Sequence, residues 1–228
     1  LIRGAFDKER VLDLIKNFVV YSDSDGKLSK KLAAYHQFYA VNSAVDSSKE
    51  VVPDPDQSRI GLVWHTQGSG KSLTMLFLAL KLRRMKDIGN PTMLIVTDRV
   101  DLDEQISGTF KKGGFPNPIR AGSVKELKDL LSSEAGRTIM TTIHKFQEYE
   151  KEKYPVLTKR ENVFVMADEA HRTQFKDLAS NMRSALPNAA YIGFTGTPID
   201  KESRSTLRTF GDYIDTYTIE ESVADNAT

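Results

Sequence analysis

The stretch of sequence that decides the fold reads Gly61-Leu62-Val63-Trp64-His65-Thr66-Gln67-Gly68-Ser69-Gly70-Lys71-Ser72. An apolar strand, a glycine-rich turn and the start of an apolar helical run follow one another here. Backbone N–H groups and the positive end of a helix dipole at such a turn bind an anion. In this pattern the lysine reaches the β- and γ-phosphates of a nucleotide, and the next hydroxyl ligates Mg²⁺. The stretch therefore predicts a nucleotide-phosphate site at residues 65–72, with Lys71 and Ser72 in these two roles.

The strict form of this pattern begins with glycine, whereas this chain has His65. Gly68 and Gly70 still supply the turn around the phosphates. The departure weakens the match without removing it, because the flanking strand and helix patterns are both present. An ordinary strand–loop–helix connection stays open as the alternative.

Composition places the chain among soluble globular proteins. Its 228 residues suit one domain, or one domain with an appendage; 28% are charged and 39% hydrophobic, and no apolar run approaches the roughly 18 residues that span a bilayer. The absence of cysteine excludes a disulfide framework and favours the cytoplasm. A net charge of +1 makes no electrostatic case for a nucleic-acid partner, so any such claim must come from motifs. The start of the chain lacks both an initiator Met and a signal peptide, and we expect a piece of something longer.

Short apolar runs alternate with helical patterns after residue 51, which is the signature of an α/β fold. We expect strands at Gly61–Trp64, Met93–Thr97, Thr138–Thr142, Val163–Ala167 and Tyr191–Phe194. We expect helices at Leu73–Met85, Asp101–Gly108, Val124–Leu131 and Gln174–Ala185. The strand runs are apolar on both faces, as in a parallel sheet covered by helices. Residues 1–50 have helical spacing on both sides of a polar loop at 22–26 and form an N-terminal helical segment, while residues 51–228 form the α/β domain.

A second candidate site follows the fourth expected strand, in the stretch Val163-Phe164-Val165-Met166-Ala167-Asp168-Glu169-Ala170-His171. Ligands of open α/β sheets bind at the carboxyl ends of the strands, where these acids lie. Asp168 would hold Mg²⁺ through a water, and Glu169 would orient and deprotonate an attacking water. Taken alone, two acids after an apolar run are often an exposed strand end. The phosphate loop about a hundred residues earlier favours the functional interpretation.

The third candidate is Gly193-Phe194-Thr195-Gly196-Thr197-Pro198, another apolar strand that ends in a turn of small residues. The hydroxyls of Thr195 and Thr197, on either side of Gly196, could bond the Asp-Glu-Ala-His loop and sense the γ-phosphate. An ordinary turn ended by Pro198 is the alternative.

These three motifs, in this order, resemble motifs I, II and III of superfamily 2 helicases and translocases. The resemblance implies a RecA-like P-loop NTPase domain with a mostly parallel sheet flanked by helices, using ATP and Mg²⁺. More specifically, the chain resembles the restriction (R) subunit of type I restriction-modification enzymes over nearly its whole length. The segments that carry this likeness are residues 6–20, 65–75, 98–105, 141–146, 168–174, 193–199 and 210–213.

The resemblance also implies roles for residues outside the three motifs. Gln37 matches the glutamine that reads adenine through its side-chain amide. The residues that follow the second and third strands match the motifs that track a DNA strand through its phosphates; they are Thr97 and Arg99, then Thr142, His144 and Lys145. His171 would couple the ATP state to the DNA side.

In this family the motor domain lies between a nuclease domain and a second RecA-like domain, which supplies an arginine finger. Thirty residues follow Pro198, too few for that second domain. We therefore expect the chain to bind ATP and to hydrolyse it very slowly. The family implies an ATP-dependent double-stranded DNA translocase and type I site-specific deoxyribonuclease, with modification and specificity subunits as partners and no membrane.

Two other functions stay open at this point. A superfamily 2 helicase that acts on RNA would carry the same Asp-Glu-Ala-His box, although the His-Thr-Gln and Thr-Gly-Thr-Pro-Ile variants argue against it. A nucleotide-dependent binding module without hydrolysis is the second, and the presence of both Lys71 and Glu169 argues against it. We interpret the nuclease-like pair Glu126 and Lys128 as part of a structural helix. We expect the basic run Lys81–Lys86 to be a solvated helix face.

Overall fold

The structure is a computed structural model that describes residues 6–24, 27–51, 58–98, 100–115, 118–133, 135–147, 154–170, 173–197 and 204–227. In chain order its elements are α2 Lys8–Asn17, β1 Val19–Ser24, β2 Lys27–Leu32, α3 Tyr35–Glu50, β3 Arg59–His65, α4 Lys71–Arg84, η1 Lys86–Ile88, β4 Thr92–Thr97, α5 Val100–Lys112, β5 Ile119–Arg120, α6 Val124–Ser132, β6 Thr138–Thr142, η2 Ile143–Phe146, β7 Val163–Ala167, α7 Thr173–Ala185, β8 Ala190–Thr195, α8 Arg204–Phe210, β9 Tyr213–Tyr217 and α9 Ile219–Ala224. No helix in these ranges has the length and apolar character needed to span a bilayer.

A seven-stranded sheet with the order β5-β6-β4-β7-β8-β3-β9 forms the centre of the molecule, and every pair in it is parallel. The five strands and four helices expected from the sequence are all present, with ends that differ by a few residues. The expected α/β fold is therefore confirmed. The two edge strands were missed because β5 has two residues and because β9 is a largely exposed run with polar residues inside it.

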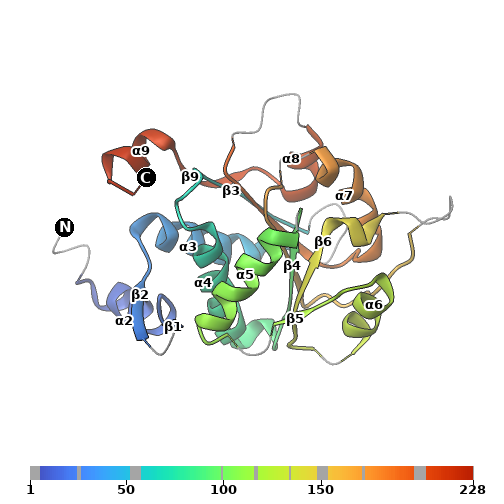
Figure 1. Cartoon of the computed structure of the whole chain (residues 1–228), viewed down its shortest axis with the longest axis horizontal. Coiled ribbons are helices and arrows are strands. Elements are labelled where there is room, and N and C mark those ends of the chain that lie inside the picture. The colour runs from blue at the N-terminus through green and yellow to red at the C-terminus, as the bar shows by residue number, and fades with distance from the viewer. Residues whose placement is uncertain are drawn as a thin grey trace.

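Helices cover both faces of the sheet (Figure 1). Successive residues of a strand point to opposite faces, so Met93 and Ile95 of β4 pack with α3, α4 and α5, whereas Leu94 and Val96 pack with α6, α7 and η2. All four side chains are fully buried. Each such burial stabilises the fold by about 1.5–3 kcal/mol before cavity effects. The two apolar layers therefore hold the strand ends in fixed positions.

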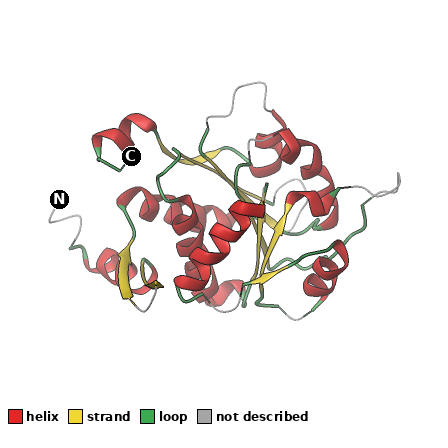
Figure 2. Ribbon diagram, in the orientation of Figure 1, coloured by secondary structure: helices red, strands yellow, loops and turns green. Residues whose placement is uncertain are grey.

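The N-terminal region differs from the expectation of two helices joined by a polar loop. Helices α2 and α3 are present, but residues 19–24 and 27–32 form an antiparallel hairpin of their own (Figure 2). Val20 and Ser22 are buried while Tyr21 between them is exposed, so the side chains alternate with the period of a strand. Phe18, at the start of the hairpin, packs against Phe38 of α3 and Phe77 of α4, with ring centroids 4.7 and 5.8 Å apart.

The basic run at the end of α4 is also different from the solvated face that we expected. Lys81 donates hydrogen bonds to the Asp13 carboxylate and to Asn42, which ties α4 to α2 and α3. Arg83 donates to Gly136 O and lies over the ring of Phe115. These two cations are therefore structural.

The helix that carries Glu126 and Lys128 is structural in the described part of the chain. Ser123 caps its first turn by accepting a hydrogen bond from Glu126 N at 3.1 Å. The Glu126 carboxylate accepts one from Gly122 N at 2.8 Å. The interpretation of this pair as part of an ordinary helix agrees with these contacts.

Gly193 of β8 lies where Phe210 of α8 packs against the sheet. A Cβ at this position would lie 2.6 Å from Leu62 Cδ2 and 3.0 Å from the Phe210 ring. We predict that Gly193→Ala lowers the free energy of unfolding by about 1–3 kcal/mol, because overpacking forces side chains out of place. Gly108→Ala is the matched control, since nothing lies within 4 Å of its added Cβ. In α5 the control should raise stability by about 0.5–1 kcal/mol. Urea unfolding measures both, and equal stability of the two variants would contradict the packing described here.

Candidate functional site

The candidate residues meet at one edge of the sheet because all its strands run in the same direction. Five neighbouring strands lead to candidate residues at this edge. Each strand either ends at one of these residues or is followed directly by one. In spatial order the residues at this edge are Thr142 of β6, Thr97 of β4, Asp168 after β7, Thr195 of β8 and His65 of β3. The last three form the half that we assigned to ATP, and the first two belong to the half that we assigned to DNA.

The loop at residues 65–72, called the phosphate loop after its predicted role, leads into the N-terminus of α4. Gly70 precedes the first residue of α4 and has φ +82°, in the left-handed region that favours glycine. Within the loop Gln67 and Gly68 are exposed, whereas Thr66 and Ser69 are buried. Lys71 starts the 14-residue helix α4, and its Nζ donates a hydrogen bond to His65 O at 3.3 Å. The loop thus directs a helix N-terminus and a cation towards the same edge of the sheet.

His65 lies beneath the loop and takes no part in the turn. It is the last residue of β3, is fully buried, and its Nε2 lies 2.6 Å from Asp215 Oδ1 of β9. The glycine of the strict pattern is therefore not needed here to form the turn. As a predicted ATP-binding residue, His65 would act on the nucleotide through the backbone of the loop.

Helix α3 braces the loop from the side. Gln37 is buried, and its Nε2 donates to Gly70 O at 3.2 Å and to Ser69 O at 3.4 Å, while its Oε1 accepts from Ala34 N. His36 Nε2 lies 3.0 Å from Ser69 O. Burial lowers the pKa of His36, so its ring is neutral at pH 7, and the carbonyl acceptor requires the proton on Nε2. Both ends of the Gln37 amide therefore contact backbone atoms, and its reading of adenine stays a prediction.

The two acids differ in their surroundings. Asp168 is buried, and its backbone N–H donates to Val96 O of β4 at 2.9 Å. Glu169 is half-buried and has φ +52°, a left-handed conformation that is strained for a residue with a side chain. Strain of this kind costs of order 1–3 kcal/mol and clusters at functional sites. His171 lies outside the described residues.

The Thr-Gly-Thr turn, residues 195–197, contacts both the loop that carries the two acids and the phosphate loop. Ala170 N donates to Phe194 O at 3.1 Å, which ties the acid loop to β8. Thr195 Oγ1 bonds within its own turn, accepting from Thr197 N and donating to Thr197 O. A Cβ added at Gly196 would lie 3.0 Å from Lys71 Nζ, so the lack of a side chain lets this turn approach the lysine. The structure therefore brings the three motifs together.

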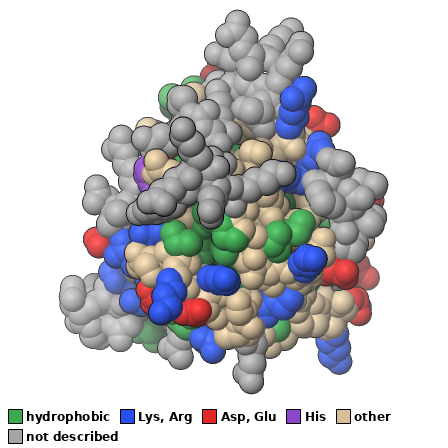
Figure 3. All heavy atoms as spheres, turned by 90° about the vertical axis from the view of Figure 1, so that its right-hand side faces the viewer, with side chains coloured by type: hydrophobic (Ala, Val, Ile, Leu, Met, Phe, Trp, Pro, Cys, Tyr) green, Lys and Arg blue, Asp and Glu red, His purple; other side chains and the backbone are tan. Residues whose placement is uncertain are grey.

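The residues assigned to DNA are less exposed than a strand-tracking role suggests. Thr97 is fully buried, Thr142 is 9% exposed, Lys145 is half-buried and His144 is exposed. Arg99 lies outside the described residues. On the face of the molecule shown in Figure 3, lysine and arginine side chains are scattered among apolar and acidic ones. The contact of these residues with DNA stays a prediction.

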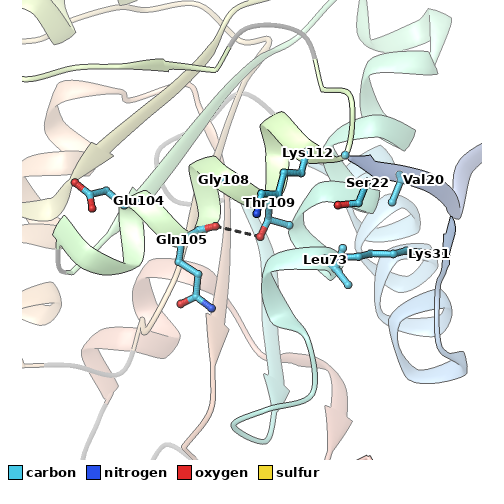
Figure 4. A pocket seen from close by; sticks show the side chains of 10 residues that line it. Val20, Ser22, Lys31, Leu73, Glu104, Gln105, Gly108, Thr109 and Lys112 are labelled. Carbon is cyan, nitrogen blue, oxygen red and sulfur yellow. Dashed lines mark hydrogen bonds between the residues drawn. The ribbon is translucent and has the colours of Figure 1, made fainter. Parts of the chain in front are cut away.

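A separate cavity of about 360 Å³ lies between the hairpin, the start of α4 and helix α5 (Figure 4). It is lined on one side by Val20, Ser22 and Lys31 and on the other by residues of α5, including Thr109 and Lys112. Thr109 Oγ1 donates to Gln105 O at 3.1 Å, so this hydroxyl is used within the helix. The cavity contains none of the residues of the phosphate loop.

The sequence analysis missed four residues at the site, namely His36, Asp215, Tyr217 and Asp225. The rings of His36 and Tyr217 stack at a centroid distance of 4.0 Å and an angle of 9°. Asp225 Oδ2 accepts hydrogen bonds from Tyr35 OH at 2.6 Å and from Tyr217 OH at 2.9 Å. The hydrogen bond between Tyr35 and Asp225 raises the pKa of Tyr35 to about 12. No local pattern marks these residues, because their contacts depend on which strand lies next to β3.

Comparison with known proteins identifies relatives of the chain. A family model described as SWI2/SNF2 ATPase matches residues 36–228. The endonuclease subunit of the type I restriction enzyme HindI from Haemophilus influenzae is 44% identical over 246 residues, covering 100% of this chain and 23% of the relative. The chain thus spans less than a quarter of the length of that protein. The expected resemblance to type I restriction R subunits is confirmed.

Solved structures share the fold at low sequence identity. The UvsW helicase from bacteriophage T4 has a TM-score of 0.62 and 16% identity, over 91% of this chain and 67% of that one. A nuclease-deletion mutant of the type ISP restriction-modification enzyme LlaGI, in complex with a DNA substrate mimic, has a TM-score of 0.59 and 20% identity, over 86% of this chain and 21% of that one. At these identities the likeness shows the fold alone.

Gly70 and Gln37 provide a test of how the loop is braced. A Cβ at Gly70 would lie 2.7 Å from Gln37 Nε2, and φ +82° strains any side chain. We predict that Gly70→Ala destabilises the chain by about 2 kcal/mol, from strain of roughly 1–2 kcal/mol plus the steric contact. Combining it with Gln37→Ala should recover the steric part, so the two effects should not add in a double-mutant cycle measured by urea unfolding. Strict additivity would show that Gln37 does not hold the loop.

Proposed function

Because the chain belongs to the SWI2/SNF2 ATPase family, we propose that it is the ATP-binding motor domain of a double-stranded DNA translocase within a type I restriction endonuclease subunit. The observation that carries the proposal is the meeting of residues 65–72, 168–169 and 195–197 at one edge of a parallel sheet. The 44% identity to a type I endonuclease subunit supports the restriction system as the setting. DNA cleavage, the modification and specificity subunits and a cytoplasmic location belong to the proposed complete protein.

The residues at this edge fit a magnesium–nucleotide complex. Gly70 leaves the entrance of α4 without a side chain, and Gly196 does the same beside Lys71. The hydroxyl of Ser69 is buried and has no hydrogen-bond partner among the described residues, so a polar ligand above the loop could use it. Magnesium-bound ATP would supply the phosphoryl group and the ion that neutralises its charge.

We assign the roles around the nucleotide as follows. Lys71 Nζ would place a positive charge beside the β- and γ-phosphate oxygens, and backbone N–H groups of the loop and of the first turn of α4 would donate to them. The N–H of Ser69 is not among these groups, because it donates to Thr66 O. Ser72 and Asp168 hold the Mg²⁺, the latter through water. Glu169 orients the attacking water and accepts its proton. Thr195, Gly196 and Thr197 transmit the state of the γ-phosphate, together with His171, and Gly196 is the residue of this turn that approaches Lys71.

The resemblance to type I restriction R subunits assigns the ends of β4 and β6 to DNA, and this favours a DNA translocase over a simple nucleotide switch. Strands β4 and β6 pair directly, with Thr97 opposite Thr142, and β7 connects them to the acids. A motor needs sequence-independent contacts with phosphates, which hydroxyl, backbone N–H and cationic groups provide. We propose that Thr97, Arg99, Thr142, His144 and Lys145 make these contacts, the buried threonines after a local opening of the strand ends.

Two substitutions in the complete subunit separate the proposed roles at the ATP site. Lys71→Ala should weaken Mg·ATP binding by about 100-fold, since it removes a charge-assisted contact worth roughly 1.5–3 kcal/mol or more. Glu169→Gln should keep binding within about 3-fold and abolish turnover, because the amide cannot accept a proton. Calorimetry gives the affinities and phosphate release gives the turnover. Normal turnover of the Glu169→Gln subunit would remove Glu169 as the general base.

A further inference from the structure

Strand β9 holds the phosphate loop although it contributes no residue to the phosphate motif. It pairs in parallel with β3, with His65 opposite Tyr217. The ladder extends one residue into the loop, because Thr66 N donates to Tyr217 O at 2.9 Å. The loop therefore starts from a backbone position that depends on a strand about 150 residues further along the chain.

Two side chains of β9 add contacts on the same side. Asp215 Oδ1 lies 2.6 Å from His65 Nε2, and the side chain of His65 is fully buried. The other ring nitrogen of His65, Nδ1, has no hydrogen-bond partner among the described residues. Asp215 is therefore the hydrogen-bonding partner that fixes the orientation of this buried ring within the described part of the chain.

The second side chain, Tyr217, reaches the loop through a stacked ring. Its ring lies flat on His36, whose Nε2 donates to Ser69 O of the loop. The edge of the same ring faces His65, with centroids 5.8 Å apart. The Tyr217 hydroxyl is held by Asp225 at the end of α9. His65, which ends the strand before the turn, and Ser69, within the turn, are thus both tied to this one strand.

We propose that Asp215 and Tyr217 are positioning residues for nucleotide binding, acting through His65 and His36 on the backbone of residues 65–70. The segment from β9 to α9 is then part of the ATP site without touching the phosphates. Phosphate affinity in such a loop depends on several N–H groups that point at one anion, so a small displacement weakens all of them together. The inference rests on the proposed function, since it requires that residues 65–72 bind a nucleotide.

The test measures Mg·ADP affinity of the 228-residue chain by calorimetry, with ADP chosen because it is not turned over. Asp215→Ala leaves the buried His65 ring without its partner, and we expect it to weaken binding by about tenfold. Asp212→Ala is the matched control, since this acid is exposed and lies directly before the same strand, and the variant should bind Mg·ADP as the unchanged chain does. The chain's single tryptophan, Trp64, precedes His65 and gives a second signal for nucleotide binding.

Tyr217 gives an independent pair of variants if Asp215→Ala fails to fold. Tyr217→Leu removes the ring stack and should weaken Mg·ADP binding by about tenfold, whereas Tyr217→Phe keeps the stack and should bind within about 3-fold. The melting temperature without nucleotide serves as the readout for folding. A positioning role predicts that the rise in melting temperature on adding Mg·ADP shrinks, whereas a purely structural role lowers the melting temperature without nucleotide and leaves that rise unchanged.

The outcomes separate the two hypotheses. Weak binding by Asp215→Ala and Tyr217→Leu, with near-normal binding by Asp212→Ala and Tyr217→Phe, supports the inference. Binding by the unchanged chain together with unaltered affinity in Asp215→Ala and Tyr217→Leu overturns the inference and leaves the proposed function intact. Equal weakening in Tyr217→Phe and Tyr217→Leu overturns the role of the stack. An unchanged chain that binds no Mg·ADP overturns both hypotheses.

Discussion

The parallel pairing of all seven strands is the constraint on which the rest of the structure depends. Parallel strands end at the same edge, so residues separated by up to 130 positions in the chain, from His65 to Thr195, become neighbours there. Buried side chains on both faces of the sheet hold the strands in register. The positions of the phosphate loop, the two acids and the Thr-Gly-Thr turn all follow from this arrangement, and so does the division of the edge into the halves that we propose for ATP and for DNA.

The phosphate loop itself is held mainly by distant parts of the chain. Helix α3 reaches it through His36 and Gln37, β9 reaches it through Asp215 and Tyr217, and the turn after β8 brings Gly196 close to Lys71. A glycine-rich loop has few side chains of its own with which to fix its shape. The surrounding elements therefore supply the rigidity that an anion site of converging N–H groups requires.

The features that the sequence predicted are those with a local physical signature. Runs such as Val163–Ala167 are apolar throughout because both faces are buried, and the phosphate loop is recognisable because glycine, lysine and serine each have a local task. The sequence does not predict the hairpin at residues 19–32, because its polar residues 22–26 have the composition of a loop between two helices. The link between His65 and Asp215 could not be read from the sequence, because it depends on the strand order β8-β3-β9.

The most direct test of a DNA-driven motor is the rate of ATP hydrolysis by the complete subunit, measured without nucleic acid, with linear double-stranded DNA and with RNA. The isolated 228-residue chain is the control. We predict that DNA stimulates ATP hydrolysis by the complete subunit and that RNA does not. The isolated chain should hydrolyse ATP about 10³–10⁵-fold more slowly, since an arginine finger from a second domain is worth that much in rate. Stimulation by RNA, or rapid hydrolysis by the isolated chain, would contradict these predictions.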